Sequence, residues 1–391
     1  MSDLFGPEHE SMRDMIRRFV RSEINPHADA WEEAGVAPLP EIFKKVGELG
    51  LLGINKPTEL GGLGLDFSYV MVAAEALGEA HCASIPFAIG AHLSAIPAIT
   101  KYGAKHLQEE YLLPAIKGEA VACIGVSEAD AGSDVSAIKT RARKDGGDYV
   151  INGAKMWITN ATHGKWISLL VNTDDENGPY RNKSLIVVPL DAKGVTIGQP
   201  LKKLGMHCSD TAPIFFDDVR VPQSNLIGEE GKGFIYQMQQ FQEERMWASL
   251  RTLAALTDAV DLTAQYVSER KAFGKALIEN QVIYHRLGDM SAQLEALRAL
   301  CYQAGRAVMA DSKDMVLLAS MAKYLAGKLA LEIPSACAQY FGGQGYMEEN
   351  RITRVLRDLR IVAVGGGANE IMLEVIAKEK EWIGRRRSRS N

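Results

Sequence analysis

Residues 140–152 read TRARKDGGDYVIN, and this stretch separates two helical parts of the chain from a β-rich middle. The runs Thr140–Arg143 and Tyr149–Asn152 flank Asp145-Gly-Gly-Asp. Adjacent glycines supply the positive φ angles of a tight turn, so the pattern predicts a β-hairpin. Further strands are expected at Trp166–Val171, Ser184–Pro189, Val195–Ile197 and Pro213–Phe216. Parallel βαβ units need long helical crossovers, and none is visible, so we expect residues 121–231 to form a compact, antiparallel, barrel-like β domain.

Helical patterns lie on both sides of this region. Residues 1–120 are expected to form an N-terminal domain of short helices, because alanine-rich runs such as Val72–Ala76 alternate with turn clusters such as the one at Gly61. Residues 232–391 are expected to form a C-terminal four-helix bundle. Its apolar stripes have helical spacing: Leu253, Leu256, Val260 and Val267; Leu287, Met290, Leu294, Leu297 and Cys301; Leu318, Met321, Leu325 and Leu329. Helices longer than about 25 residues would carry apolar surface on two sides, which indicates packing in an oligomer.

The composition is that of a globular enzyme, since 47% of the 391 residues are apolar and 24% are charged. A net charge of −5 predicts no attraction to nucleic acid or to anionic membranes. The one dense basic run, Arg385, Arg386, Arg387 and Arg389, is interpreted as a solvated tail. Five cysteines without a CxxC pair favour a reducing compartment. Without a signal-peptide pattern or an 18-residue apolar run, we expect a cytoplasmic enzyme with no membrane segment.

The common catalytic motifs are absent. The sequence contains no HExxH, GxSxG or P-loop motif, no dinucleotide-binding glycine fingerprint, and no histidine spacing that suits a metal. Two polar segments remain. Val126–Asp134 could be a surface turn or a backbone cradle for a phosphate or heterocycle. In Met156–Asn160, Trp157 and Thr159 share one face of a strand, which suits either core packing or contact with a planar cofactor.

Six motifs in order resemble the acyl-CoA dehydrogenase family over nearly the whole chain. They are Gly61-Gly-Leu-Gly, Val126-Ser-Glu with Ala131-Gly-Ser-Asp, Lys155-Met-Trp-Ile-Thr-Asn, Leu204-Gly-Met with Ser209-Asp-Thr, Glu269-Arg-Lys-Ala-Phe-Gly and Gln339-Tyr-Phe-Gly-Gly-Gln-Gly. The resemblance implies the three domains described above and bound FAD. It also implies an acyl-CoA substrate, a homotetramer and electron transfer to an electron-transfer flavoprotein.

The resemblance also implies residue roles. Those expected to hold the flavin are Ile124, Val126, Ser127, Gly132, Ser133, Trp157, Ile158 and Thr159, with Ser133 also touching the acyl-CoA. Those expected to reach the FAD of a neighbouring subunit are Arg270, Phe273 and Gln281, although Phe273 could instead be a core residue. Those expected to complete the dinucleotide site are Gln339, Gly342, Gly343, Ala368, Asn369 and Glu370.

The family's usual catalytic base is missing. Most members carry it as the Glu of a Tyr-Glu-Gly-Thr segment, where this chain has Gly365-Gly366-Gly367-Ala368. The backbone N–H of Gly366 could still donate to the thioester oxygen. An isovaleryl- and long-chain-type branch places the base on a bundle helix before an arginine, and Glu244 before Arg245 matches that register. Glu243 lies about 100° away around the helix, so only one of the two can face the flavin.

Alternatives remain for each of these side chains. Glu243 and Glu244 could form a solvated acidic pair, and Glu370 is a third carboxylate that the resemblance assigns to FAD. Arg245 is expected at the substrate beside Gln242, or in a simple helix salt bridge. The glycines at 365 and 366 leave room for a branch near C3 or a bulkier chain, most like citronellyl-CoA-type enzymes. The alternatives for the whole protein are an oxidase or desulfinase of the same fold, or a non-catalytic flavoprotein.

Overall fold

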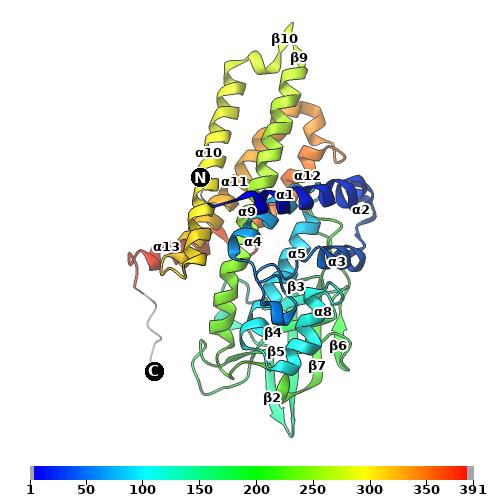
Figure 1. The fold of residues 1–391 in the computed structure, drawn as a ribbon, viewed down its shortest axis with the longest axis vertical. Helices are drawn as coiled ribbons and strands as arrows, with labels where there is room; N and C mark the ends of the chain where they lie inside the picture. Colours follow the sequence, from blue (N-terminus) through cyan, green and yellow to red (C-terminus); the bar gives the residue numbers. More distant parts are fainter. Residues whose placement is uncertain (1–3, 385–391) are drawn as a thin grey trace.

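Helices make up both ends of the chain and a sheet lies between them in sequence, in a computed structural model that describes residues 4–384 (Figure 1). The basic run at 385–389 lies outside the described residues. The N-terminal helices are α1 (Pro7–Phe19), α2 (Ala28–Ala34), α3 (Leu39–Glu48), α4 (Phe67–Gly78), α5 (Ser84–Ala95), α6 (Pro97–Tyr102), α7 (Lys105–Leu107) and α8 (Leu113–Ile116). The alanine-rich run 72–76 lies inside α4 and is fully buried there or nearly so, as its composition predicts.

The middle region is one mixed sheet of eight strands. They are β1 (Ala122–Gly125), β2 (Arg141–Asp145), β3 (Asp148–Thr159), β4 (Trp166–Asn172), β5 (Lys183–Pro189), β6 (Val195–Ile197), β7 (Thr211–Pro222) and β8 (Leu226–Ile227). Their order is β6-β7-β3-β2-β4-β5-β8, with β1 beside β4. The predicted hairpin is confirmed, because Asp145 on β2 pairs with Asp148 on β3 in an antiparallel ladder.

Two expectations about this sheet are wrong. It is not wholly antiparallel, since β1 runs parallel to β4 and β2 meets β4 in parallel at Arg141 and Asn172. The crossover from β1 to β4 is made by the β2–β3 hairpin and its loops, which include a short 3₁₀ turn at Val135–Ala137, so no α-helix connects these parallel strands. The described strands also form no closed barrel, because the sheet ends at β6 and β8, two strands of only three and two residues.

Three long helices dominate the C-terminal region. They are α9 (Gly233–Glu269), α10 (Gln281–Met309) and α11 (Met315–Phe341), of 37, 29 and 27 residues, and α12 (Arg351–Leu359) and α13 (Asn369–Glu379) pack against α11. The short strands β9 (Lys271–Ala272) and β10 (Lys275–Ala276) form a hairpin between α9 and α10. In Figure 1 this hairpin projects at the top, at the end of the molecule opposite the sheet. Helix α9 therefore links the sheet to the far end of the bundle.

The predicted stripes on α9 and α10 are buried throughout, but the one on α11 is not. Leu318, Met321 and Leu325 are only partly buried, whereas the alanines at 319, 322 and 326 are fully buried. Helix α11 packs against α9, α10, α12 and α13, so small residues face the closest neighbours. The larger residues lie on a face that this single chain leaves partly open.

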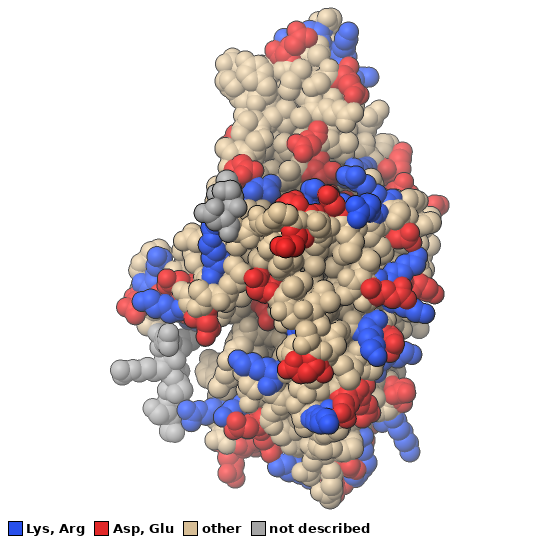
Figure 2. All heavy atoms as spheres, viewed as in Figure 1, with Lys and Arg blue, Asp and Glu red and all other residues tan. Residues whose placement is uncertain are grey.

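Charged side chains of both signs are interspersed over the face shown in Figure 2, and no large single-sign patch stands out on it. None of the helices in the described part of the chain combines the length and apolar character that a membrane span requires.

Candidate active site between α9, α11 and the triple-glycine loop

The two segments expected to hold a flavin are bound to each other. The backbone N–H of Met156 on β3 donates to the carbonyl of Ser127 at 2.9 Å. The fully buried Lys155 donates to the carbonyl of Val126 and to the carboxylate of Glu128, both at 2.9 Å. Burial lowers the pKa of Lys155 to about 8, and the Glu128 charge opposes that change. The end of β3 and the loop that begins at residue 126 therefore form one unit.

Within this unit, Trp157 lies on the surface. A bulge interrupts the β3–β7 pairing between Lys155 and Ile158, and Trp157 adopts a φ of 59°. The tryptophan is 52% exposed while Ile158 is buried, so core packing is the wrong interpretation for Trp157. Thr159 follows, partly buried, and Asn160 then anchors the strand to α5 by donating to the carbonyl of Ala88 at 2.9 Å.

These features fit an FAD ring system. An exposed indole, the partly buried hydroxyl-bearing residues Ser127 and Thr159, and a loop whose Gly132 has open space around it are the groups that a planar, hydrogen-bonding cofactor needs. Of the other predicted residues, Ile124 is partly buried and Val126 is buried behind the loop, whereas Ser133 is exposed. Among the described residues, no cluster of three His, Cys, Asp or Glu side chains could hold a metal ion.

A second group of predicted FAD residues lies at the projecting end of the bundle. Arg270 directly follows α9, Phe273 occupies the β9–β10 turn, and Gln281 begins α10. All three are exposed, and Phe273 is fully so, which makes the core interpretation wrong for this residue. The stretch 339–343 ends α11 in the same place, because Phe341 stacks on Tyr266 of α9 with ring centroids 4.2 Å apart. Gly342 and Gly343 have open space around them.

The two groups are far apart in a single chain. Ala368 follows the loop that contacts Lys323 on α11, whereas Gln339 lies sixteen residues further along that helix. At 1.5 Å per residue, this separation is about 24 Å. The loop before Ala368 is therefore separated from Gln339, Gly342 and Gly343 along α11. The hairpin that follows Arg270 and carries Phe273 likewise lies at the end of the molecule opposite the sheet that carries Trp157 and Thr159 (Figure 1).

The side chain of Glu244 lies next to Gly366. A Cβ built on Gly366 would lie 3.3 Å from the Oε1 of Glu244 and 3.5 Å from the Cε of Lys323. The carboxylate of Glu244 thus lies beside the place where a side chain at position 366 would begin. Burial raises the pKa of Glu244, while the charges of Arg245 and Lys323 pull it down. A carboxylate with a raised pKa suits a general base.

The neighbouring carboxylate faces elsewhere. Oε2 of Glu243 lies 3.5 Å from the Nζ of Lys56, a buried lysine of the N-terminal region. Glu244 makes no such ion pair among the described residues, so the two carboxylates have different partners. The pair is not simply solvated, because Glu243 has an ion-pair partner and Glu244 is partly buried. Both also line a small cavity between α9 and the N-terminal region, of about 30 Å³, together with Leu93 and Trp247.

Arg245 faces α11 and not a carboxylate. Its Nη1 donates to Gln242 Oε1 at 3.2 Å and to Ser320 Oγ at 3.4 Å, and its Nε has no partner among the described residues. No carboxylate of the described residues lies within ion-pair distance of it, so the helix salt bridge is the wrong alternative. Gln242 in turn donates to the carbonyl of Met238 at 3.1 Å.

The start of α13 closes the other side of the site. Asn369 is its first residue, and a Cβ on Gly327 of α11 would lie 2.2 Å from the Asn369 Oδ1. That oxygen is buried and has no partner among the described residues. Glu370 in the first turn is exposed. The absent side chain at 327 lets α13 approach α11 closely, one helical turn beyond Lys323. Sequence reasoning missed both Lys56 and Lys323.

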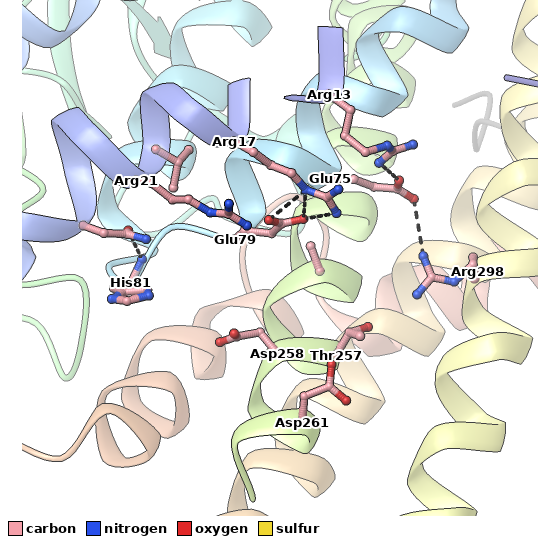
Figure 3. Close-up of a pocket in the computed structure, with 13 residues that line it drawn as sticks. Arg13, Arg17, Arg21, Glu75, Glu79, His81, Thr257, Asp258, Asp261 and Arg298 are labelled. Atoms are coloured by element: carbon pink, nitrogen blue, oxygen red, sulfur yellow. Dashed lines mark hydrogen bonds and ion pairs between the residues drawn. The ribbon is translucent and has the colours of Figure 1, made fainter. Parts of the chain in front are cut away.

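A larger cavity of about 620 Å³ contains none of the predicted site residues (Figure 3). It lies between the N-terminal helices and the bundle and is lined by charged side chains, most of them in ion pairs. Arg13 pairs with Glu75 and Arg17 with Glu79, each at 2.7 Å. These two pairs satisfy four of the charges that line the cavity.

Comparison with known proteins places the whole chain in a single group. The N-terminal, middle and C-terminal domain models of the acyl-CoA dehydrogenases match residues 6–119, 123–219 and 231–380. The mitochondrial long-chain specific acyl-CoA dehydrogenase of Mus musculus is 35% identical over 384 residues, covering 96% of this chain and 87% of that protein. The mouse short-chain specific enzyme is 35% identical over 371 residues, covering 94% and 89%. A crystal structure of a probable acyl-CoA dehydrogenase from Mycobacterium abscessus superposes with a TM-score of 0.92 at 37% identity, covering 96% of this chain and 100% of that one.

Proposed function

Because the chain belongs to the acyl-CoA dehydrogenase family, we propose that it removes the α-proton of an acyl-CoA thioester with Glu244 as the base. As a member of this family the chain is an FAD-dependent oxidoreductase. The observation that carries the assignment of the base is the approach of Glu244 Oε1 to the space beside Gly366. A glycine cannot abstract a proton, and the carboxylate of Glu244 fills the same space from another element.

The residues around Glu244 divide the work of deprotonation. Glu244 takes the α-proton, and its raised pKa makes it a stronger base than a carboxylate in water. The backbone N–H of Gly366 donates to the thioester oxygen, where negative charge develops as the α C–H bond breaks. Bound FAD supplies the acceptor for the hydride that leaves the β-carbon. Burial of Arg245 and Gln242 beside the base keeps water away from it, and we assign both, with Ser133, to the substrate side.

The FAD site proposed here is shared between two copies of the chain. Ser127, Trp157 and Thr159 hold the flavin ring, with Ile124, Val126, Gly132, Ser133 and Ile158 around it and Ala368, Asn369 and Glu370 beside it. A neighbouring copy contributes Arg270, Phe273, Gln281, Gln339, Gly342 and Gly343. The exposure of the second group, and the separation of Gln339 from the loop before Ala368 along α11, support this arrangement. The partly open apolar face of α11 supports assembly as a homotetramer.

For the substrate, we propose a branched or medium- to long-chain acyl-CoA, with citronellyl-CoA-like thioesters as one candidate. Gly365 and Gly366 leave the wall beside Glu244 without side chains, which accommodates a branch near C3. The long-chain and short-chain mouse relatives are equally similar to this chain, so identity does not select a chain length. We further propose an electron-transfer flavoprotein as the electron acceptor and the cytoplasm as the location.

The test is anaerobic mixing of the FAD-loaded protein with short, long, isovaleryl and citronellyl thioesters, followed by absorbance of the oxidised flavin. Rapid bleaching by wild type, lost by more than about a hundredfold in Glu244→Gln and kept within a few-fold in Glu243→Gln, is the expected result. Glu243→Gln is the matched control, since it changes the adjacent carboxylate that pairs with Lys56. Equal rates in Glu244→Gln and wild type would refute the base. Bleaching by no thioester, sulfite release, or rapid reoxidation in air would favour a non-catalytic flavoprotein, a desulfinase or an oxidase.

A further inference from the structure

Lys323 is a buried cation that the proposed reaction leaves without a role. It lies on α11 and is fully inaccessible to solvent. Its Nζ donates to the carbonyl of Val362 at 2.5 Å and to the carbonyl of Gly367 at 3.1 Å. These carbonyls lie on either side of Gly366, so a single ammonium group fastens the loop before and after the glycine that faces Glu244.

The loop needs such a fastening. Gly366 has a φ of 67° and Gly367 a φ of 100°, so two consecutive residues adopt backbone conformations that only glycine accepts easily. Consecutive glycines are also the most flexible residues in an unfolded or mobile loop. The direction of the Gly366 N–H therefore depends on contacts from outside the loop, and Lys323 supplies two of them.

Lys323 also lies next to the base. A Cβ on Gly366 would be 3.5 Å from Lys323 Cε and 3.3 Å from Glu244 Oε1, so those two atoms lie within about 7 Å of each other, the sum of the two distances. Burial lowers the pKa of Lys323 to about 8, whereas the charge of Glu244 raises it. The carboxylate of Glu244 accepts no hydrogen bond among the described residues, so its interaction with Lys323 is one of charge.

We propose that Lys323 is a positioning residue that acts on both the base, Glu244, and the amide donor, the Gly366 N–H. Its charge favours the ionised form of Glu244, and its two hydrogen bonds hold the Gly366 N–H in place for the thioester oxygen. This inference rests on the proposed function, since it takes Glu244 as the base.

The charges around Glu244 determine the direction of the expected change. Arg245 on α9 and Lys323 on α11 both lower the pKa of Glu244, and burial raises it. Glu243 faces Lys56 instead, and Arg251 contributes its positive charge near Lys323. Removal of the Lys323 charge leaves Arg245 as the remaining cation that favours the Glu244 carboxylate. The pKa of Glu244 must then rise. As the pH is lowered, the rate of flavin reduction must therefore begin to decrease at a higher pH than in wild type.

The experiment is the pH profile of anaerobic flavin reduction by the best thioester, in wild type, Lys323→Met and Lys323→Gln. The acid limb of this profile is the decrease in rate at low pH, where the base becomes protonated. Lys323→Met is expected to move the acid limb to higher pH by about one unit, as for loss of a nearby opposite charge. It is also expected to lower the maximal rate by about tenfold or more, with a smaller effect on KM, because the amide donor loses its support. Lys323→Gln keeps one donor for the loop carbonyls, so it should regain part of the maximal rate without restoring the acid limb.

The matched control is Lys183→Met, which removes another buried lysine that donates to a backbone carbonyl, that of Pro179. It should lower the melting temperature without moving the acid limb. An unchanged acid limb in both Lys323 variants, with an active wild type, would overturn the inference. Loss of folding or of FAD in both variants, with both kept in Lys183→Met, would assign Lys323 a structural role and overturn it as well. An inactive wild type, or an active Glu244→Gln, would instead overturn the proposed function.

Discussion

The substitution Gly366→Ala tests the geometry of the site with one carbon atom. The new Cβ would lie 3.3 Å from Glu244 Oε1 and 3.5 Å from Lys323 Cε, so the carboxylate must give way by a few tenths of an ångström. The φ of 67° at this position adds a backbone cost of about 1–2 kcal/mol for any residue with a Cβ. We therefore expect a loss of about 1–2 kcal/mol in the free energy of unfolding.

Thermal melting of the FAD-loaded protein measures the first effect, and a decrease of roughly 1–3 °C is expected for a chain of this size. Flavin reduction measures the second, and the rate should fall by about tenfold or more, since displacement of a base or a donor by less than 1 Å is costly. The matched control is Gly178→Ala, at an exposed loop glycine without positive φ and with open space around its Cβ position. A Gly366→Ala protein with the melting temperature and rate of wild type would refute the placement of Glu244 beside this glycine.

Three further predictions follow from the contacts. Lys155→Met leaves Glu128 buried without its cation, so we expect the free energy of unfolding to fall by about 3 kcal/mol or more and the FAD content to decrease. Urea unfolding measures the first effect, and an unchanged unfolding curve would contradict the role of the pair. Burial raises the pKa of Asp358 to about 6, so the stability contributed by its protonated form should be lost as the pH rises from 4 to 7. Asp358→Asn should flatten the plot of melting temperature against pH over that range. Phe273→Ala removes a fully exposed ring, so the free energy of unfolding of the single chain should change by less than about 0.5 kcal/mol. The affinity for FAD and the stability of the oligomer, measured by light scattering, should both decrease. A variant that keeps both would refute the shared site.

Local chemistry explains why much of the fold could be predicted from the sequence. The turn between Asp145 and Asp148 can be read from the local sequence, because Gly146 accepts the positive φ of 61° that this tight turn requires. The parallel pairing of β1 with β4 could not be predicted in this way, because it depends on where the preceding helices deliver Ala122. The alanine face of α11 was missed for a related reason. Alanine is a weak marker of burial in a sequence, yet it allows the closest helix packing.

In the candidate site, too, local signals could be read from the sequence and long-range contacts could not. The proposal of Glu244 over Glu243 as the base rests on the family resemblance in the register before Arg245 and on the rotation of a helix. Lys323 was missed because a lysine within a helix ordinarily indicates a solvent-facing position. One signal could have revealed it: Lys323 lies four residues after Ala319 and four before Gly327, so it belongs to the face of small residues that packs closely.

The approach of Glu244 to position 366 gives a physical reason for this chain to carry a carboxylate at only one of the two positions. A glutamate at 366 would begin 3.3 Å from an existing carboxylate oxygen. The carboxyl group of that glutamate, two bonds beyond its Cβ, would share the buried space with the carboxylate of Glu244, and like-charge repulsion would raise the pKa of one of them. Lys323 and Arg245 could not neutralise both in a site that burial already makes unfavourable for charge. Glycine at 366 therefore does more than remove a base. In the roles proposed above, it gives Glu244 the space and the cations that would otherwise be shared, and its freedom at positive φ lets Lys323 hold the loop in the form that presents the amide.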